Sequence, residues 1–429
     1  MADNDVLLKR AHQILPGASL GSFYLPEAHE FVVERGDGSR VWDVEGRGYI
    51  DYVLGSGPMV LGHCHPEVVA AIIRQATKGA TFYALNDVAV ALGEKIVGAA
   101  PCAEAIKFCG SGAEATFYAL RLARAATGRT KVLKFEGGYH GHHDYAMMSV
   151  TPTRLAPFPA AVPDSAGIPE DIERHVLVAP FNDLEATLDI VTRHRHEVAA
   201  VIVEPLSRML MPRPGFLDGL RQATREVGAV LVFDEVVTGF RVAWGGAQEL
   251  YGVTPDLACY GKIIGGGLPL AAVAGKREFL ELANPRKKGA PDYAYMSGTL
   301  NGNPLSAAAG LATLEVLQRP GSYERLRQVG DSLRAGLRDI LAHLGIPAQV
   351  LGTGPLANIY FTSEPIVDYR SSLKADSRTT QQLGRALLSR GVLTNLAAKM
   401  YLSLAHSDAD IQRTLEAFEA ALRELQAGR

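Results

Sequence analysis

A lysine and an aspartate at the ends of two apolar strands are the residues of this chain best suited to chemistry. Lys262 precedes Ile-Ile-Gly-Gly-Gly, and Asp234 lies 28 residues upstream, after the apolar run 229–233. A lysine amine can form a Schiff base with an aldehyde, and a carboxylate can keep a pyridine nitrogen protonated. The following glycines let the backbone approach a flat ring. Together they predict a covalently held aldehyde cofactor with a pyridine ring, although each residue alone is as typical of a loop or a cap.

A glycine-rich turn at the start of an expected helix is a candidate phosphate site. Cys-Gly-Ser-Gly-Ala-Glu at 109–114 follows a short strand, and a helix begins there with free N–H groups and a positive dipole end. A dinucleotide pattern would need a third glycine at Ala115, and Lys262 is not followed by the Ser or Thr of a nucleotide-binding loop. A single phosphate fits better than NAD or ATP, but a plain tight turn is an equal alternative.

The segment Glu-Gly-Gly-Tyr-His-Gly-His-His-Asp at 136–144 follows the next strand and allows three interpretations. Tyr139 or His140 could stack on an aromatic ring at the carboxyl edge of an α/β sheet. His140, His142 and Asp144 also match the first part of a metal-hydrolase ligand set, but the histidine expected after Asp144 is a tyrosine. The third interpretation is a surface turn with hydrogen-bonded histidines. We expect no metal here, because short motifs often match by chance.

Composition indicates a globular protein that acts on small molecules. Apolar residues make up 47% and charged residues 21% of 429 residues, and 43 cations against 46 anions give a net charge of −3. That balance argues against nucleic-acid binding. No signal peptide or membrane span is evident, so we expect a cytoplasmic protein. The cysteines form no CxxC motif and are expected to be buried free thiols: Cys64, Cys102, Cys109 and Cys259.

Strand and helix patterns alternate through the middle of the chain and predict an α/β fold. Expected strands cover 106–109, 131–135, 198–203, 229–233 and 270–274, and expected helices cover 113–126, 184–196, 215–227 and 303–317. We therefore expect a large domain, 65–318, with a mostly parallel sheet covered by helices. A smaller α+β domain, 319–429, would pack with an N-terminal arm, 1–64.

Several motifs in the same order resemble class III aminotransferases, which use pyridoxal 5′-phosphate (PLP). They are Gly-Ser-Gly-Ala-Glu-Ala at 110–115, Gly-Gly-Tyr-His-Gly at 137–141, Val-Glu-Pro at 203–205, Phe-Asp-Glu-Val at 233–236, Thr-Gly-Phe-Arg at 238–241, Gly-Lys at 261–262 and Ser-Gly-Thr-Leu-Asn-Gly-Asn-Pro at 297–304. The resemblance covers nearly the whole chain. It implies fold type I of the PLP-dependent transferases, with small-molecule substrates and a homodimer that shares its active sites.

The resemblance also implies roles for individual residues. Lys262 would form the internal aldimine and carry a proton, while Asp234 would hold the pyridinium nitrogen. The phosphate would bind at the glycine-rich turn with help from the second subunit, and the ring would lie between Tyr139 and Val236. The remaining cofactor-binding residues implied in this way are Ser111, Gly112, Ala113, His140, Glu204 and Thr299.

Within the family the motifs look most like glutamate-1-semialdehyde 2,1-aminomutase, but the segments that bind substrate differ. That enzyme has an arginine that grips a substrate carboxylate shortly after a glycine, whereas Gly17 is followed by Ala-Ser-Leu-Gly-Ser-Phe. Its Asn-containing segment after Glu-Pro is replaced by a shorter loop with Arg208 and Arg213, and an acidic residue near its C-terminus appears here as Ala398. Loss of a bidentate carboxylate ligand is not a neutral change.

These differences favour an aminotransferase that moves an amino group between an amino acid or amine and a keto acid or aldehyde. Four aromatic side chains could line a pocket for a bulkier or more apolar donor, or could equally be core residues: Phe23, Tyr24, Phe82 and Tyr83. An acidic substrate would be held by Arg208 or Arg213. The alternatives are the aminomutase itself with a relocated carboxylate ligand, a PLP-dependent racemase, a metal-dependent hydrolase and a non-catalytic PLP-binding regulator.

Overall fold

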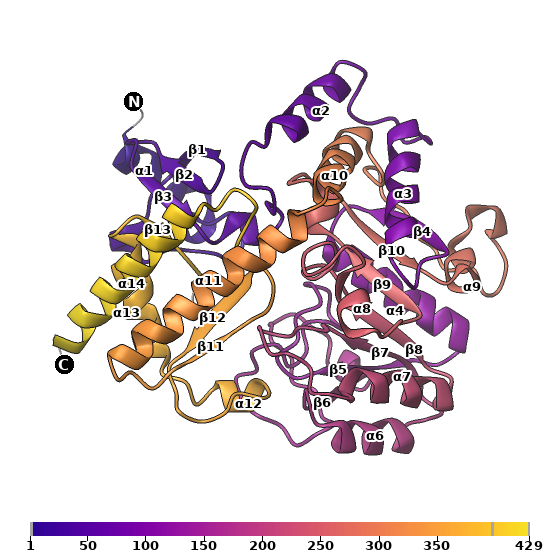
Figure 1. Cartoon of the computed structure of the whole chain (residues 1–429). Coiled ribbons are helices and arrows are strands. Elements are labelled where there is room, and N and C mark those ends of the chain that lie inside the picture. The colour runs from indigo at the N-terminus through magenta and orange to yellow at the C-terminus, as the bar shows by residue number, and fades with distance from the viewer. Residues whose placement is uncertain (1–2, 396–398, 428–429) are drawn as a thin grey trace. The chain divides into compact units, whose positions relative to one another are not determined.

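The chain divides into two compact units in a computed structural model that describes residues 3–395 and 399–427 (Figure 1). Unit 1 comprises Met1–Pro66, Glu324–Ser363 and Ala375–Arg429. Unit 2 comprises Glu67–Tyr323 and Glu364–Lys374. Ala398, where the sequence departs from the aminomutases, lies outside the described residues.

The expected C-terminal domain, 319–429, is wrong for one internal segment. Residues 364–374 cluster with unit 2, although the chain on both sides of them belongs to unit 1. The physical reason is a set of polar contacts between distant parts of the sequence. Arg370 forms an ion pair with Glu136, and the Asn182 amide donates to the carbonyl of Val367. Hydropathy and turn patterns do not report such contacts.

Unit 2 is built on a seven-stranded sheet, and the expected mostly parallel α/β architecture is confirmed. The four strand pairs from β9 to β6 are parallel, whereas β10 is antiparallel to both of its neighbours, β4 and β9. In sheet order the strands are β4 (Ala105–Cys109), β10 (Ala271–Gly275), β9 (Leu257–Tyr260), β8 (Val230–Asp234), β7 (Val198–Val203), β5 (Lys131–Phe135) and β6 (Val176–Ala179).

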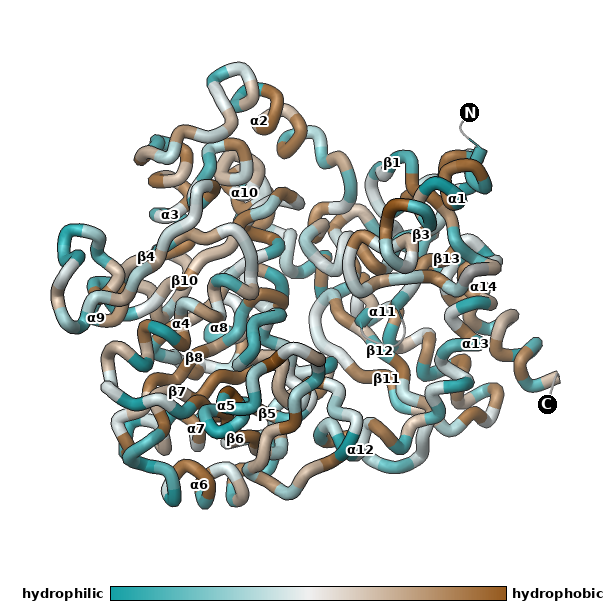
Figure 2. The backbone as a smooth tube through the Cα atoms, turned by 180° about the vertical axis from the view of Figure 1, so that it is seen from behind, coloured by the Kyte–Doolittle hydropathy of each residue, from teal (hydrophilic) through white to brown (hydrophobic). Residues whose placement is uncertain are grey.

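Helices cover this sheet because its central strands are apolar on both faces. Every residue of β6, β7, β8, β9 and β10 is buried, and the apolar colouring is clear at β7 and β8 in Figure 2. Such continuous Val/Ile/Leu runs are stable only between two layers of helix. The helices of unit 2 are α2 (Pro66–Ala76), α3 (Asp87–Ala99), α4 (Gly112–Thr127), α5 (Glu170–Glu173), α6 (Leu184–Arg193), α7 (Phe216–Val227), α8 (Gly246–Tyr251), α9 (Arg277–Leu280), α10 (Pro304–Leu317) and α12 (Tyr369–Ser372).

Unit 1 combines two small sheets with three long helices and the N-terminal helix. One sheet has the order β1 (Val33–Asp37), β2 (Arg40–Asp43), β3 (Gly48–Asp51) and β13 (Val392–Leu393), and the other has β11 (Gln349–Leu351), β12 (Leu356–Tyr360) and β14 (Met400–Tyr401). The helices are α1 (Asn4–Ile14), α11 (Ser322–His343), α13 (Ser377–Leu388) and α14 (Asp408–Ala427). Leu333, Leu337 and Phe418 lie in its apolar core.

Three of the four cysteines are buried as expected, and the fourth is not. Burial raises the pKa of the Cys102 thiol to about 12 and also raises those of Cys109 and Cys259, so these thiols stay protonated and unreactive. Cys64 is exposed, because it lies in the loop that leads into α2 with a left-handed backbone. Among the described residues, no helix is long and apolar enough to cross a bilayer.

The short helix that begins at Lys262 is locked against α10 by two glycines. A Cβ on Gly310 would lie 1.9 Å from the carbonyl oxygen of Ile264, within η4 (Lys262–Gly265). Gly266 follows η4 with φ +58°, and a Cβ there would lie 2.5 Å from the carbonyl of Ala309. The absence of both Cβ atoms lets backbone pack on backbone, which fixes the turn that carries Lys262.

Gly310→Ala should therefore destabilise unit 2 by about 1–3 kcal/mol, because the added methyl group has no room and α10 must shift. Thermal melting of the cofactor-free protein would measure this loss. The matched control is Gly98→Ala, at an exposed position near the end of α3 where a Cβ meets no atom within 4 Å. The control should lose nothing and gain at most about 1 kcal/mol. Equal melting temperatures for the two variants would contradict the proposed locking.

Candidate active site

The candidate site lies where parallel strands end side by side. Because β5, β7, β8 and β9 are neighbours and parallel, their carboxyl ends meet at one edge of the sheet. Tyr139 follows β5, Glu204 follows β7, Asp234 ends β8 and Lys262 follows β9. Ligands of open α/β sheets bind at such an edge. The topology therefore brings together residues that are up to 123 positions apart in the chain.

A buried histidine–aspartate pair forms the centre of the site. Asp234 and His140 are 5% and 2% exposed, and the Nδ1–H of His140 donates to Oδ2 of Asp234 over 2.8 Å. The carboxylate can only accept, so this bond fixes the proton on Nδ1. The N–H of Val236 donates to the other carboxylate oxygen over 3.1 Å. The sequence suggested that His140 could stack on a ring, but the structure uses it to hold Asp234.

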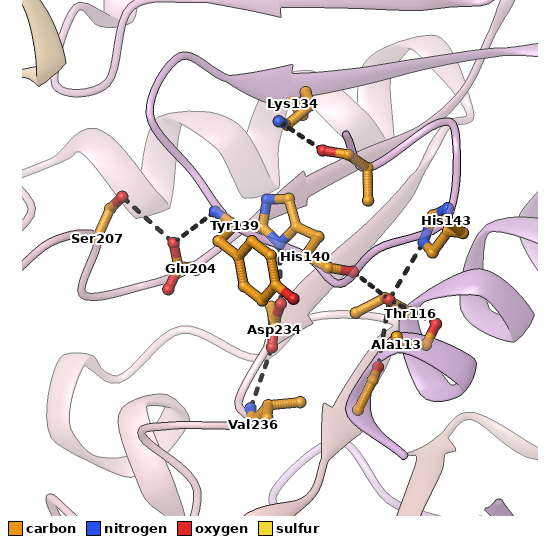
Figure 3. A network of polar contacts seen from close by, with 12 residues as sticks. Ala113, Thr116, Lys134, Tyr139, His140, His143, Glu204, Ser207, Asp234 and Val236 are labelled. Atoms are coloured by element: carbon orange, nitrogen blue, oxygen red, sulfur yellow. Dashed lines mark hydrogen bonds and ion pairs between the residues drawn. The ribbon is translucent and has the colours of Figure 1, made fainter. Parts of the chain in front are cut away.

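Tyr139 presents its ring beside this pair. The side chain is 53% exposed, and its backbone N–H donates to Oε2 of Glu204 over 3.0 Å. Partial burial, together with the negative charges of Asp234 and Glu204, raises the pKa of the Tyr139 hydroxyl, so it stays neutral at physiological pH. Figure 3 shows Glu204, His140 and Asp234 gathered around this ring. Of the two residues considered for stacking, Tyr139 is the one with an accessible ring face.

The start of α4 provides a cradle for an anion. Ser111 is the N-cap and accepts from the N–H of Glu114, while Glu114 accepts from the N–H of Gly110. Among the described residues, the N–H groups of Gly112 and Ala113 donate to no protein atom. Free N–H groups at a helix N-terminus favour a phosphate. The signal from the glycine-rich turn thus corresponds to a real helix start.

Val236 packs into the space left by two glycines at the same edge. A Cβ on Gly112 would lie 3.0 Å from a methyl group of Val236, and one on Gly261 would lie 3.3 Å from it. Lys262 comes next, is half-buried and adopts a left-handed backbone with φ 50°. A side chain at Gly112 or Gly261 would displace Val236. The glycines therefore keep this surface open to a flat group.

Two supporting residues were not found from the sequence. The hydroxyl of Thr116 lies 2.5 Å from the carbonyl oxygen of His140, which ties α4 to the loop after β5. Lys134 is fully buried on β5, where its amine donates to the carbonyls of Ala146 and Met148 and burial lowers its pKa to about 7. Thr116 lies one helical turn after Gly112 on the same face of α4, and this spacing is the sequence feature that could have identified it. Lys134 gave no signal.

The proposed metal ligands do not converge. His140 is buried against Asp234, whereas His142 and Asp144 are exposed. Among the residues that the structure describes, no group of three or more His, Cys, Asp or Glu side chains is arranged to hold a metal ion. The arrangement of these residues gives the hydrolase interpretation no support.

The two candidate substrate arginines differ in their surroundings. The Nε of Arg208 donates to the carbonyl of Gly137 and its Nη2 donates to the carbonyl of Val150, both over 2.7 Å. Arg213 is exposed, and its backbone N–H donates to Asn182 over 2.8 Å. Arg208 therefore already bonds protein carbonyls.

The aromatic candidates are exposed, so the alternative of ordinary core packing is wrong. Tyr83 and Phe82 are exposed in unit 2, and Phe23 and Tyr24 are exposed in unit 1. Thr299 is also exposed, in the loop before α10.

Comparison with known proteins agrees with this geometry. A sequence model of the class-III aminotransferase family matches residues 24–422. Glutamate-1-semialdehyde 2,1-aminomutase of Desulfitobacterium hafniense (strain Y51) is 42% identical over 426 residues, which are 97% of each chain. An omega-transaminase from Sphaerobacter thermophilus is 35% identical with a TM-score of 0.94, covering 99% of this chain and 98% of that one. A transaminase with PLP bound is 31% identical with a TM-score of 0.91 and the same coverage.

The residues at the carboxyl edge fit the cofactor of this family. The free N–H groups of α4 suit a phosphate, the buried Asp234 suits a ring nitrogen, and the apolar side chain of Val236, packed against Gly112 and Gly261, suits the face of a flat ring. Lys262 supplies the amine just after the neighbouring strand β9. The chain therefore belongs to the class III aminotransferase family, and its cofactor is pyridoxal 5′-phosphate.

Proposed function

We propose that the protein is an aminotransferase that moves an amino group between an apolar amine or amino acid and a keto acid or aldehyde. The observation that carries this proposal concerns the side chains expected to bind the substrate carboxylate. Residues 18–23, which follow Gly17, contain no arginine, and Arg208 donates to the carbonyls of Gly137 and Val150. A substrate carboxylate is then without the bidentate ligand that an aminomutase uses. The similarity to the omega-transaminase fold, with a TM-score of 0.94, also supports it.

Each residue of the edge has a task in such a transfer. The Nζ of Lys262 would hold the cofactor and then move a proton to and from the carbon that bears the amino group. Asp234, oriented by His140, would hold a proton on the ring nitrogen. Tyr139 and Val236 would orient the ring from its two faces. Once bound, PLP supplies an electron sink for removal of the Cα proton.

An aminomutase is the second candidate, and the sequence comparison favours it. The Desulfitobacterium relative is 42% identical over 97% of each chain and is named for that activity. In that case Arg213, which is exposed before α7, would be the relocated carboxylate ligand. In the aminotransferase, an exposed aromatic such as Tyr83 would instead contact an apolar donor. The two candidate functions therefore differ in which side chains would bind the substrate.

A substrate comparison distinguishes the two functions. With an aryl-alkyl amine and pyruvate or 2-oxoglutarate, we expect turnover that requires the keto acid. With glutamate-1-semialdehyde alone, we expect little 5-aminolevulinate. If 5-aminolevulinate forms without a keto acid and at the highest rate of any substrate, the protein is an aminomutase. Product analysis by chromatography measures both reactions in the same preparation.

Arg213→Ala adds a test of the carboxylate ligand. Two donors with the same apolar group, one with a carboxylate and one without, should lose activity equally if Arg213 does not bind substrate. Loss of a charged hydrogen-bonding partner would instead lower kcat/KM for the carboxylate donor alone by roughly one to two decades. Arg225→Ala is the matched control, because Arg225 lies in the last turn of α7, at the opposite edge of the sheet.

Lys262→Ala should abolish turnover, because Lys262 follows β9 at this edge and would hold the cofactor covalently, whereas the amine of Lys134 is fully buried and donates to two backbone carbonyls. The protein-linked absorption band should disappear, while PLP binding persists more weakly through the start of α4. Absorption spectra and equilibrium dialysis would measure both effects. Multiple turnovers by this variant would mean that another residue performs the chemistry.

We also propose that a second copy of the chain completes the site. Tyr83, Leu85 and Leu300 are 74%, 89% and 52% exposed, an unusual exposure for large apolar side chains. The amide of Asn86 donates to the carbonyl of Gly302 over 3.0 Å, so the segment with Tyr83 and Leu85 lies beside the segment with Leu300. Thr299 lies next to Leu300 and would contact the phosphate of the cofactor that is bound to the other subunit.

Leu85→Asp should convert a dimer into monomers and weaken PLP binding, because a charge would enter the apolar contact. Thr299→Ala should keep the dimer but weaken PLP binding through loss of one hydroxyl. Sedimentation velocity and PLP titration would measure these outcomes. A wild-type monomer with normal turnover would refute the shared site.

A further inference from the structure

The segment 364–374 makes a bidentate ion pair with the residue that follows β5. The Nε and Nη2 of Arg370 donate to the two carboxylate oxygens of Glu136 over 2.7 and 3.0 Å. The Nη2 also donates to the carbonyl of Ala156 over 2.6 Å, and the guanidinium lies 4.1 Å from the ring centroid of Phe158. Glu136 is only 5% exposed. Removal of the guanidinium would therefore leave a buried carboxylate without its ion-pair partner, which is destabilising.

The neighbouring residue Tyr369 packs on Gly137. A Cβ on Gly137, whose φ is +82°, would lie 2.7 Å from the Tyr369 ring. Arg208 lies on the same ring, with its guanidinium 4.9 Å from the centroid, and its Nε donates to the carbonyl of Gly137. The Tyr369 ring therefore packs against the Cα of Gly137, and the Arg208 guanidinium bonds its carbonyl oxygen.

A third contact joins the segment to the loops after β6 and β7. The amide of Asn182 donates to the carbonyls of Val367 and Met211, each over 3.0 Å, and its oxygen accepts the N–H of Arg213. The segment 364–374 therefore binds the loops that follow three adjacent strands. No pattern in the sequence marked it for such a task.

The two residues that these contacts hold lie directly before the residues proposed to lie beside the cofactor ring. We define the Tyr139 loop as residues 136–140, in which Glu136 and Gly137 precede Tyr139 and His140. Three successive N–H groups of this loop are hydrogen-bonded: that of Gly137 to Ser149, that of Gly138 to Phe135 and that of Tyr139 to Glu204. Any loosening at its first residues would reach the Tyr139 ring and the His140–Asp234 bond.

We propose that Arg370, Tyr369 and Arg208 are positioning residues for the Tyr139 loop and thereby set the affinity for the cofactor. This inference rests on the proposed roles of Tyr139 and His140 beside the cofactor ring. Arg370 fixes the first residue of the loop and Tyr369 with Arg208 fixes the second. Arg208 thus acts on the loop and is not a substrate ligand.

The test compares Arg370→Ala with Arg319→Ala. Arg319 also makes a bidentate pair, with Glu67, but on the exposed surface of unit 2. In the cofactor-free protein, Arg370→Ala should raise hydrogen exchange of the 137–139 amides by about tenfold, and it should weaken PLP binding by a similar factor, as expected from loss of a charged hydrogen bond. Arg319→Ala should change neither quantity. Equal behaviour of the two variants would overturn the proposal.

Two conservative variants keep the test decisive if Arg370→Ala folds poorly. Glu136→Gln removes the carboxylate charge but keeps the size of the side chain. Arg370→Lys keeps the positive charge but loses the bidentate hydrogen-bonding geometry. Both should raise amide exchange in the Tyr139 loop by less than Arg370→Ala. A fall in melting temperature without a local change in exchange would show a purely structural role and would also overturn the proposal.

Arg208→Ala separates positioning from substrate binding. It should weaken PLP binding and lower kcat/KM by the same factor for donors with and without a carboxylate. A loss confined to the carboxylate donor would show that Arg208 binds substrate and would refute its place here. The exchange and PLP measurements need no turnover, so a wild-type enzyme without aminotransferase activity would refute the proposed function and leave this inference standing.

Discussion

A carboxylate that remains charged inside a protein needs fixed hydrogen-bond donors, and the site is organised around this requirement at Asp234. The carboxylate is 5% exposed and receives the Nδ1–H of His140 and the N–H of Val236. These donors come from the ends of two strands, so the pair forms only when β5 and β8 are correctly placed in the sheet. The need for donors on a buried charge couples the chemistry to the order of the strands.

Supporting contacts extend outward from this pair in two directions. On one side, Thr116 bonds the carbonyl of His140 and connects it to α4, where the N–H groups of Gly112 and Ala113 donate to no described protein atom. On the other side, Glu204 accepts the N–H of Tyr139 and links the ends of β5 and β7. Each contact restrains backbone next to a functional side chain. A ring bound here meets groups whose orientation is set before it arrives, which lowers the cost of binding.

The relation to known proteins separates the shared chemistry from the choice of substrate. The chain matches both an aminomutase and an omega-transaminase over nearly its full length, so this overall similarity does not by itself decide between the two reactions. Specificity depends on side chains around that common centre. In this chain Arg208 bonds two backbone carbonyls and the segment after Gly17 has no arginine. Those two features carry the proposal that its donor differs from that of the aminomutases.

The alternation of apolar strands and helices, the start of a helix near Ala113 and the motifs that predicted the cofactor could all be recognised in the sequence. These features are local: a run of Val and Ile, a glycine-rich turn or a lysine after a strand can be seen within a few residues. The three-dimensional structure was needed to show that His140 holds Asp234, that Cys64 is exposed and that residues 364–374 belong with unit 2. Arg370 and Glu136 are 234 positions apart, and their ion pair arises because the fold brings both to one sheet edge. A contact of that kind depends on the path of the whole chain, so no local pattern of residues can reveal it.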